Sequence, residues 1–396
     1  MSNPLSLFPI ALAAGGGRVD DLPATGAVAA GFTLLQRSAP LVRAMAGVRS
    51  AVLLPPSAAV MTALAASDGR GCVFLPPSAD EQTMASMLAD ADVGAVFTTH
   101  ALAAHLPVGR HAVVLLDDAP HAATVIARGT ETVVDLGSHF GLDLEGEEEA
   151  GRDEECVISY GDSPASPAIG AVFTHRNLLA LARGAVDAVS LLKGDVVLAA
   201  LPPANFAGFA LTIAGPLLAG AHVITLPRFD AQAALQAIEG HGVTILVGES
   251  AMFAAMAAAL ETRGHGLAAP TLRVCVCLGA EVDIALQDEW HRRTGIELRF
   301  AFGTPDAPFA CFNAPHFPNR RGTLGVPFPG MQVSVRNTQN GEPVPSGKAG
   351  ELWLRGDPMC SWHLNAPATA ARRADGWLPT AVQVRERPDG AFERAT

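Results

Sequence analysis

The sequence is poor in basic residues. It contains 27 lysines and arginines against 39 aspartates and glutamates, which gives a formal net charge of −12 at pH 7. Nucleic acids and anionic membranes are bound mainly by positively charged surfaces. The charge balance therefore excludes both as primary partners. Part of the acidity is concentrated in residues 143–156, DLEGEEEAGRDEEC, which we interpret as a solvated linker.

Long apolar runs and targeting segments are also absent. No run approaches the roughly 20 apolar residues that a membrane span requires. The first residues, MSNPLSLFPIALAAGGG, lack the basic start of a signal peptide. We therefore expect a cytoplasmic protein without a membrane span.

The six cysteines show no C-x-x-C spacing. Cys275 and Cys277 are separated by one residue in an apolar run, so we expect both on one face of a strand. The spacing gives no support to a zinc or redox motif. We expect buried thiols, as in proteins of a reducing cytosol.

The first three hundred residues alternate between short apolar runs and amphipathic segments. The apolar runs predict strands at 50–56, 71–77, 93–99, 111–118, 195–203, 221–227, 242–248 and 272–279. The amphipathic segments predict helices at 58–66, 80–91, 229–240, 250–262 and 283–294, and a further helix beginning at 174–179. Apolar strands that alternate with helices are typical of βαβ units, in which helices cover both faces of a mostly parallel sheet.

The pattern changes after about residue 322. Short alternating strands follow one another there, separated by Gly, Pro and the turn pair Asn340-Gly341. A chain of 396 residues also exceeds what one hydrophobic core usually serves. We predict an α/β protein with mostly parallel βαβ subdomains over 1–190 and 191–320, and a small β-barrel or β-sheet subdomain over 321–396.

A co-linear set of motifs points to one family. The motifs are GAVFTHRNLLA, LPPANFAGFA, LRVCVCLGAEV, RFAFGTPD, GTLGVPFPGMQVSVRN, GEPVPSGKAGELWLRG, NAPATA and DGWLPT. In order and spacing, the chain resembles the large N-terminal domain of the adenylate-forming (AMP-binding) superfamily, which includes the acyl- and aryl-CoA synthetases. The resemblance covers roughly residues 51–392. It implies the fold of that domain, and a reaction in which a carboxylate and ATP form an acyl-adenylate before the acyl group passes to a thiol.

The phosphate loop implied by the resemblance departs from the family pattern. With Gly170 at the last glycine of the family loop, Ile169 stands where the family has a lysine. Pro164 and Pro167 remove backbone donors, and Asp162 adds negative charge to a site for an anion. We therefore expect tight triphosphate binding to be lost. The candidate nucleotide contacts left in and after this loop are Ser163, Ser166, Gly170 and Thr174.

Other nucleotide positions are partly retained. The resemblance gives Phe302 the role of stacking on adenine and places Asp306 at the family's magnesium-linked glutamate, where a carboxylate can still hold a hard cation. Pro305 replaces a phosphate-binding threonine, and Val382 replaces the aspartate that grips the ribose. The resemblance also assigns three small residues to the nucleotide site: Gly279, Ala280 and Gly303.

The acyl pocket implied by the resemblance lies at the carboxyl ends of the strands of the second subdomain. Asn205 stands at a family histidine beside this pocket. The full set of candidate acyl-pocket residues is Asn205, Phe206, Gly208, Glu249 and Gly279. Crevices form at the carboxyl ends of parallel strands. The alternative is that Asn205, Glu249 and Asp306 only satisfy local backbone groups at strand ends.

Several other motifs favour ordinary structural roles. The stretch GDSPA at 161–165 lacks the final glycine of a serine-nucleophile turn, which disfavours a hydrolase. The four histidines between 100 and 121 lack metal-ligand spacing. No residue is assigned a catalytic role.

Three hypotheses for the function follow. Family members continue into a small C-terminal lid domain after the point at which this sequence ends, and we expect that domain to be absent. The first hypothesis is a pseudoenzyme or accessory protein that binds a carboxylic acid or acyl thioester, with ATP and magnesium binding impaired or lost. The second is an atypical acid–thiol ligase that needs a partner enzyme to complete its site. The third is an interaction subunit of a biosynthetic assembly, with CoA or a carrier protein as candidate partners.

Overall fold

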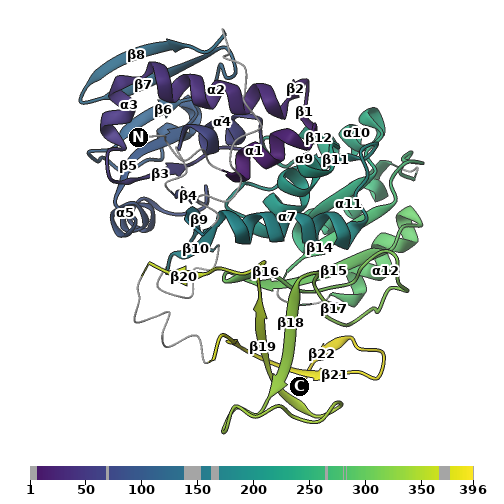
Figure 1. The fold of residues 1–396 in the computed structure, drawn as a ribbon. Helices are drawn as coiled ribbons and strands as arrows, with labels where there is room; N and C mark the ends of the chain where they lie inside the picture. The colour runs from purple at the N-terminus through teal and green to yellow at the C-terminus, as the bar shows by residue number, and fades with distance from the viewer. Residues whose placement is uncertain are drawn as a thin grey trace.

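The computed structural model describes residues 7–67, 71–137, 153–161, 169–263, 266–279, 281, 283–364 and 375–395. These residues form two large sheets, each packed against helices, and one small sheet (Figure 1). The N-terminal sheet lies at the upper left in that view, the central sheet lies on the right, and the small sheet lies below both. The predicted α/β class is confirmed.

The N-terminal sheet has a parallel centre and antiparallel edges. From edge to edge it contains β20 (Trp362–His363), β10 (Ala171–Thr174), β9 (Glu155–Ser159), β4 (Cys72–Phe74), β3 (Arg49–Val52), β5 (Val93–Thr98), β6 (Ala112–Leu115), β7 (Ala122–Ala127) and β8 (Thr130–Asp135). Strands β9, β4, β3, β5 and β6 pair in parallel, and the others pair antiparallel. The four strands predicted between residues 50 and 118 are all present.

The central sheet is built in the same way. From edge to edge it contains β17 (Val326–Pro327), β16 (Ala307–Phe312), β15 (Leu298–Thr304), β14 (Val274–Leu278), β13 (Ile245–Glu249), β11 (Val196–Ala199), β12 (His222–Thr225), β1 (Arg18–Val19) and β2 (Leu22–Pro23). Strands β15, β14, β13, β11, β12 and β1 pair in parallel. The carboxyl ends of the parallel strands therefore meet along one edge of this sheet.

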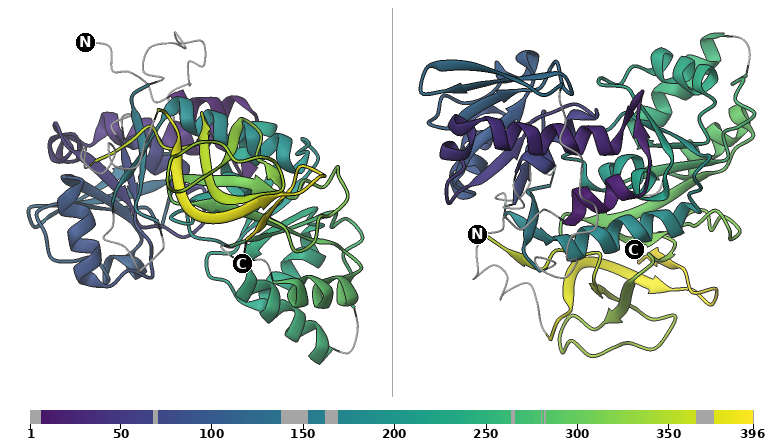
Figure 2. Two further views of the ribbon diagram at one scale, coloured as in Figure 1. Left: turned by 90° about the horizontal axis from the view of Figure 1, so that it is seen from below. Right: turned by 45° about the horizontal axis from the view of Figure 1, so that its top comes forward.

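The small sheet is antiparallel. It contains β18 (Met331–Arg336), β19 (Ala349–Gly356), β21 (Leu378–Glu386) and β22 (Phe392–Arg394), in that order. Seen from below in Figure 2, its yellow strands curve across the front of the molecule. In the described residues this region is a curled sheet of four strands, the β-sheet form of the small subdomain that we predicted.

Sheet membership crosses the predicted subdomain boundaries at three places. β1 and β2 come from the first predicted segment but pair within the central sheet. β20 comes from the last segment but pairs with β10 of the N-terminal sheet, and β17 extends the central sheet past residue 321. The sheets are thus built from distant parts of the chain, and the division at residues 190 and 320 stays a prediction.

Thirteen helical segments are described. They are α1 (Leu7–Ala14), α2 (Ala24–Arg37), α3 (Ala39–Ala44), α4 (Ala59–Ala66), α5 (Glu81–Asp90), α6 (His100–Ala103), α7 (His175–Val189), α8 (Phe206–Phe209), the π-helical turn η1 (Ala210–Ala214), α9 (Gly215–Ala219), α10 (Ala231–His241), α11 (Ser250–Arg263) and α12 (Ile284–Thr294). The predicted helices are all present. Within the described residues, no helix is both long enough and apolar enough to cross a bilayer.

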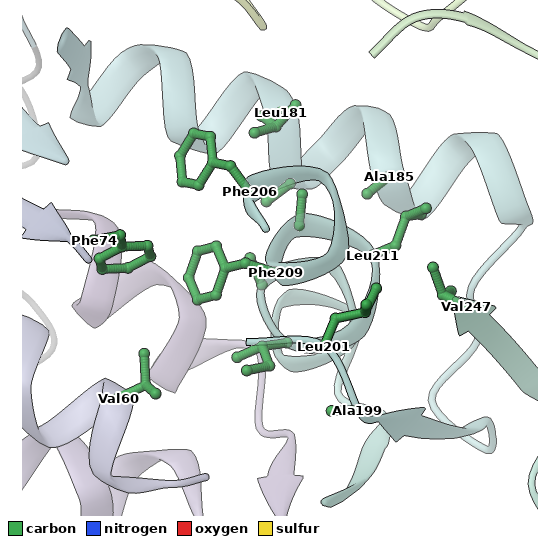
Figure 3. Packing of buried hydrophobic residues seen from close by; sticks show 14 of the residues in the cluster. Val60, Phe74, Leu181, Ala185, Ala199, Leu201, Phe206, Phe209, Leu211 and Val247 are labelled. Atoms are coloured by element: carbon green, nitrogen blue, oxygen red, sulfur yellow. The ribbon is translucent and has the colours of Figure 1, made fainter. Parts of the chain in front are cut away.

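A cluster of aromatic side chains joins the two large sheets. Phe74 of β4 packs edge-to-face against Phe206 and Phe209, with ring centroids 6.0 and 5.2 Å apart. Phe173 of β10 approaches Phe206 to 4.6 Å, and Phe8 of α1 lies 6.4 Å from Phe209. Figure 3 shows Phe74 and Phe209 facing each other across this contact, with Phe206 nearby. The helix that carries Phe206 is therefore fixed between the sheets.

Candidate functional site

A crevice lies at the carboxyl ends of the central strands. Its volume is about 490 Å³, within the range of small-molecule sites. Its walls come from the loop after β11, the ends of β13 and β14, the β15–β16 hairpin and the end of β9. This is the position at which open α/β sheets bind ligands.

A hydrogen-bonded polar pair stands in this crevice. The Asn205 Nδ2 donates to Glu249 Oε1 at 2.7 Å. The Asn205 Oδ1 accepts from the backbone N–H of Gly208 at 2.9 Å and so caps α8. The two alternatives considered for Asn205 therefore coexist, because one amide both satisfies local backbone and faces the crevice.

Apolar and thiol groups lie beside this pair. Phe206 lines the crevice while its ring belongs to the aromatic cluster between the sheets. The hydroxyl oxygen of Ser250 lies 3.3 Å from the sulfur of Cys277, a buried thiol near the end of β14. Burial raises the pKa of Cys277 to about 11. Near neutral pH this thiol is therefore protonated and is a poor nucleophile toward a bound acyl group.

The structure brings together most of the residues predicted for the acyl pocket. Asn205, Phe206, Glu249 and Gly279 all line the crevice. Gly208 does not line it, but its N–H holds Asn205 in place. The spatial grouping agrees with the prediction, while the binding roles of these residues stay predictions.

The residues predicted to contact the nucleotide are more dispersed. Ser163, Ser166 and Ala280 lie outside the described residues. Gly303 lines the crevice. Thr174 is buried, and its hydroxyl accepts from the N–H of Asn177 as part of the capping box that starts α7. Thr174 therefore has a structural role in this chain, and its contact with a nucleotide stays a prediction.

Gly170 and the nearby Gly161 pack closely against neighbouring side chains. An added Cβ at Gly170 would lie 2.8 Å from Leu364 Cδ1, and the Gly170 carbonyl accepts from the N–H of Leu364 at 3.0 Å. Gly161, the second residue of the phosphate loop, packs on Pro305, since an added Cβ would lie 2.9 Å from the Pro305 Cγ. The start of the loop thus lies directly against the β15–β16 turn.

The side chain at the ribose position packs with apolar neighbours. Val382 is partly buried and contacts the main hydrophobic cluster. Its backbone N–H donates to the Thr380 hydroxyl. The valine side chain therefore packs against its apolar neighbours and offers no hydrogen-bond acceptor to a ribose hydroxyl.

Phe302 is more enclosed than an adenine-stacking ring would need to be. It is only 2% exposed and is not among the residues that line the crevice. The guanidinium of Arg394 lies over its ring, 5.8 Å from the centroid. The stacking role of Phe302 stays a prediction that this geometry does not favour.

The Asp306 carboxylate lies beside a cysteine thiol and a histidine imidazole. One oxygen of its carboxylate is 2.5 Å from His363 Nε2 and 3.6 Å from Cys360 Sγ. Magnesium prefers oxygen ligands and retains several waters. The buried thiol and imidazole around Asp306 do not fit that ion.

Sequence reasoning missed Cys360 and His363. Their C-x-x-H spacing in CSWH was a signal, but two ligand-type residues in isolation are weak grounds for a site. Ser250 and Thr304 of the crevice were also missed. Their positions depend on how neighbouring strands align, which short-range patterns do not specify.

Comparisons with known proteins agree on one family. The model described as "AMP-binding enzyme" matches residues 41–361. The feruloyl-CoA synthase of an Amycolatopsis species is 29% identical over 352 residues, which cover 87% of this chain and 67% of that protein. The long-chain-fatty-acid–CoA ligase of Yersinia pestis is 32% identical over 236 residues, 57% of this chain and 41% of that protein. This chain thus spans between 41% and 67% of the length of these two relatives.

Solved structures show the same fold. Apo MatB from Rhodopseudomonas palustris superposes with a TM-score of 0.78 at 19% identity, covering 98% of this chain and 78% of that one. The N-terminal domain of FACL13 from Mycobacterium tuberculosis superposes with a TM-score of 0.76 at 21% identity, covering 92% of this chain and 91% of that one. The mixed α/β architecture with a small curled sheet is therefore shared with these structures.

Proposed function

The chain belongs to the family of AMP-binding enzymes, and on that premise we propose that it binds a carboxylic acid or its acyl thioester while ATP-dependent adenylation is impaired or lost. The relatives named above are a CoA synthase and a CoA ligase by their names. Those activities concern the longer proteins. For this chain we propose the same class of ligand, a carboxylic acid or its thioester with CoA.

The observation that carries the proposal is the charge of the crevice. Among the described residues that line it, Glu249 is the one charged side chain, and no Lys, Arg or His is present. The loop residues 162–168, DSPASPA, contain no cation in sequence either. A triphosphate is held by charge-assisted contacts, and each lost contact costs about 2–3 kcal/mol. Tight ATP binding is therefore disfavoured.

The ribose and magnesium positions support the same conclusion. Val382 packs into apolar surroundings where the family has a ribose-gripping aspartate. Asp306 is engaged with His363 and Cys360. The groups that would hold the ribose and the metal in the family pattern are thus replaced or committed to other contacts.

The crevice favours an uncharged acyl group near Glu249. At about 490 Å³ it has room for a small or medium acyl chain. A free carboxylate close to Glu249 would meet like-charge repulsion. We therefore infer that an acyl thioester, or an acid whose carboxylate points away from Glu249, is the preferred ligand.

Pyrophosphate exchange with ATP is the deciding measurement for adenylation. We expect no exchange above background with this chain across a panel of fatty and aromatic acids. Robust exchange by the chain alone would contradict the impaired-enzyme proposal and favour an active acyl-adenylating ligase. Exchange that appears only when a separate protein is added would favour the alternative in which a partner completes the site.

Ligand-dependent thermal unfolding tests the crevice directly. A ligand at a hundred times its Kd stabilises the folded state by about 2.7 kcal/mol. We expect acids or acyl thioesters to raise the melting temperature and ATP to leave it unchanged. Stabilisation by ATP alone would contradict the assignment, and no response to any of these ligands would favour an interaction subunit.

The Glu249→Gln variant sharpens this test. The substituted amide keeps an oxygen that accepts from Asn205 but removes the negative charge. We expect roughly fivefold tighter binding of a free acid, equivalent to about 1 kcal/mol of relieved repulsion, with little change for the neutral thioester. Glu261→Gln is the matched control, because Glu261 is exposed at the far end of α11. Equal responses of the two variants would place the bound acid outside this crevice.

A further inference from the structure

Three metal-ligating side chains from two distant segments meet in the interior. Asp306 lies in the turn between β15 and β16, while Cys360 and His363 flank the start of β20. Their ligand atoms all lie within 4.8 Å of one another. Within the part of the chain that the structure describes, this is the one group of three or more such residues that converges in this way.

Backbone hydrogen bonds fix both segments in place. The N–H of Cys360 donates to the Asp306 carbonyl at 2.8 Å. The N–H of Ser361 donates to the Val172 carbonyl at 2.8 Å, and β20 pairs antiparallel with β10. The three side chains are thus positioned by backbone contacts on either side, as a preorganised ligand set requires.

All three side chains are buried. Cys360 is 1% exposed, His363 is 2% and Asp306 is 6%. Burying a carboxylate lowers the free energy of unfolding unless the carboxylate is paired or coordinates a metal. The contact with His363 meets this need in part, and the Cys360 thiol donates to the same carboxylate oxygen. A thiol, an imidazole and a carboxylate therefore converge on one buried point, which is the ligand combination that a divalent metal ion can use.

One ligand–ligand distance already matches a tetrahedral site, and a second needs a small adjustment. With zinc bonds of ~2.3 Å to sulfur and ~2.0 Å to oxygen, the two ligand atoms lie roughly 3.5 Å apart. Cys360 Sγ and Asp306 Oδ1 are 3.6 Å apart. The imidazole nitrogen and the carboxylate oxygen, now 2.5 Å apart, would separate to roughly 3.3 Å. A movement of less than ~1 Å therefore converts the hydrogen bond into two metal bonds.

We propose that Asp306, Cys360 and His363 form a binding site for a borderline divalent cation, with Zn²⁺ as the fitting ion. Thiolate and imidazole ligands select zinc over magnesium. The described residues supply three of the four ligands of a tetrahedron, and we assign the fourth to a water or a ligand oxygen. This inference goes beyond the proposed function and holds whether or not an acid binds in the crevice.

The expected consequence is structural. Asp306 belongs to a hairpin of the central sheet, and His363 belongs to the N-terminal sheet. A shared metal would therefore link the two sheets at the edge of the crevice, next to Pro305. A metal ion that binds only the folded protein would raise its free energy of unfolding.

Cobalt substitution tests the site in the full chain. After treatment with a chelator, Co²⁺ is titrated and its thiolate charge-transfer and tetrahedral visible bands are recorded. We expect one equivalent to bind, Zn²⁺ to displace it, and Zn²⁺ but not Mg²⁺ to raise the melting temperature. Cys360→Ser and His363→Gln should weaken binding roughly tenfold or more, and Cys360→Ser should abolish the charge-transfer band.

Cys311→Ala is the matched control, because Cys311 is a buried thiol of β16 outside the group of three ligands. It should bind Co²⁺ like the unaltered chain. A chain that binds no Co²⁺, or a band that survives Cys360→Ser, overturns the proposal. Zinc-edge X-ray absorption on the unaltered protein does not depend on the folding of any variant. One sulfur in the first shell supports the site, and a shell of oxygen alone overturns it.

Discussion

At the scale of single residues, Gly303 controls the geometry of the crevice wall. It lies in β15 just before the turn that carries Pro305 and Asp306. An added Cβ would lie 1.9 Å from the carbonyl oxygen of Pro308. That neighbour is backbone, so no side-chain rotation relieves the clash. Gly303 is thus required by the close approach of the two strands.

We expect Gly303→Ala to lower the free energy of unfolding by about 3 kcal/mol, at the upper end of the cost of overpacking. Urea denaturation measures this change. Gly240→Ala is the control, since Gly240 lies in α10 with no atom within 4 Å of an added Cβ. Replacing a helical glycine by alanine there should stabilise by roughly 0.5–1 kcal/mol. Similar effects of the two substitutions would show that the hairpin tolerates a side chain at position 303.

Single residues of the crevice and of the buried cluster of Asp306, Cys360 and His363 differ in how far they could be predicted from the sequence. Asn205 and Glu249 were predictable, because the family resemblance places them at the acyl pocket and both follow strands with a clear apolar pattern. Glu249 ends β13, and Asn205 lies in the loop after β11. Cys360 and His363 were not, because their meeting with Asp306 depends on the pairing of β20 with β10. That pairing joins distant parts of the chain, and two-residue strands leave no periodic pattern.

At the scale of elements, three neighbouring strands are tied together at their amino ends. Asp195 directly precedes β11, Thr244 precedes β13 and Arg273 precedes β14. The Asp195 carboxylate accepts from the Thr244 hydroxyl at 2.7 Å and from two nitrogens of Arg273, at 2.5 and 3.1 Å. Asp195 is only 5% exposed. This network is at the end of the sheet away from the crevice.

We expect Asp195→Asn to destabilise the fold by about 3 kcal/mol at pH 7, the cost of breaking a buried ion pair. Burial opposes ionisation of Asp195, but the hydrogen bonds from Arg273, Thr244 and the Leu192 N–H outweigh it and lower its pKa. A lowered native pKa stabilises the fold above the unfolded value of about 3.9. The difference between the two proteins should therefore be constant above roughly pH 5 and shrink below about pH 4.

Urea denaturation of both proteins between pH 7 and pH 3.5 measures this difference. Asp230→Asn is the control, because Asp230 only caps the exposed start of α10 and asparagine caps nearly as well. A difference between the Asp195 variant and the unaltered chain that did not depend on pH would mean that packing, and not charge, holds the three strands.

The strands that were predicted from sequence each contain an apolar run that the structure buries. β11, β12, β13 and β14 read as continuous apolar stretches because the parallel sheet buries both of their faces. The β7–β8 hairpin was missed. It turns at Arg128 and Gly129, both with positive φ, and its second strand is largely exposed, so its pattern lacks apolar alternation.

At the scale of the whole molecule, one hydrophobic cluster runs through all three sheets. It includes Phe8 near the start of the chain, Phe74 in the N-terminal sheet, Leu246 in the central sheet and Phe392 in the small sheet. Such continuity favours a single cooperative folding unit over three independent ones. Strands also pair across residues 190 and 320, and the division at these positions stays a prediction.

Phe209→Ala tests this continuity. Phe209 is 1% exposed and packs against Phe74 and Phe8, so its truncation should cost about 4 kcal/mol. Because the ring lies between the two large sheets, we expect one unfolding transition, shifted as a whole in both circular dichroism and tryptophan fluorescence. Phe317→Ala is the control, since Phe317 is 46% exposed and should change stability by less than about 1 kcal/mol. If Phe209→Ala instead splits the transition into two steps, the subdomains fold separately and the aromatic cluster is a docking contact between them.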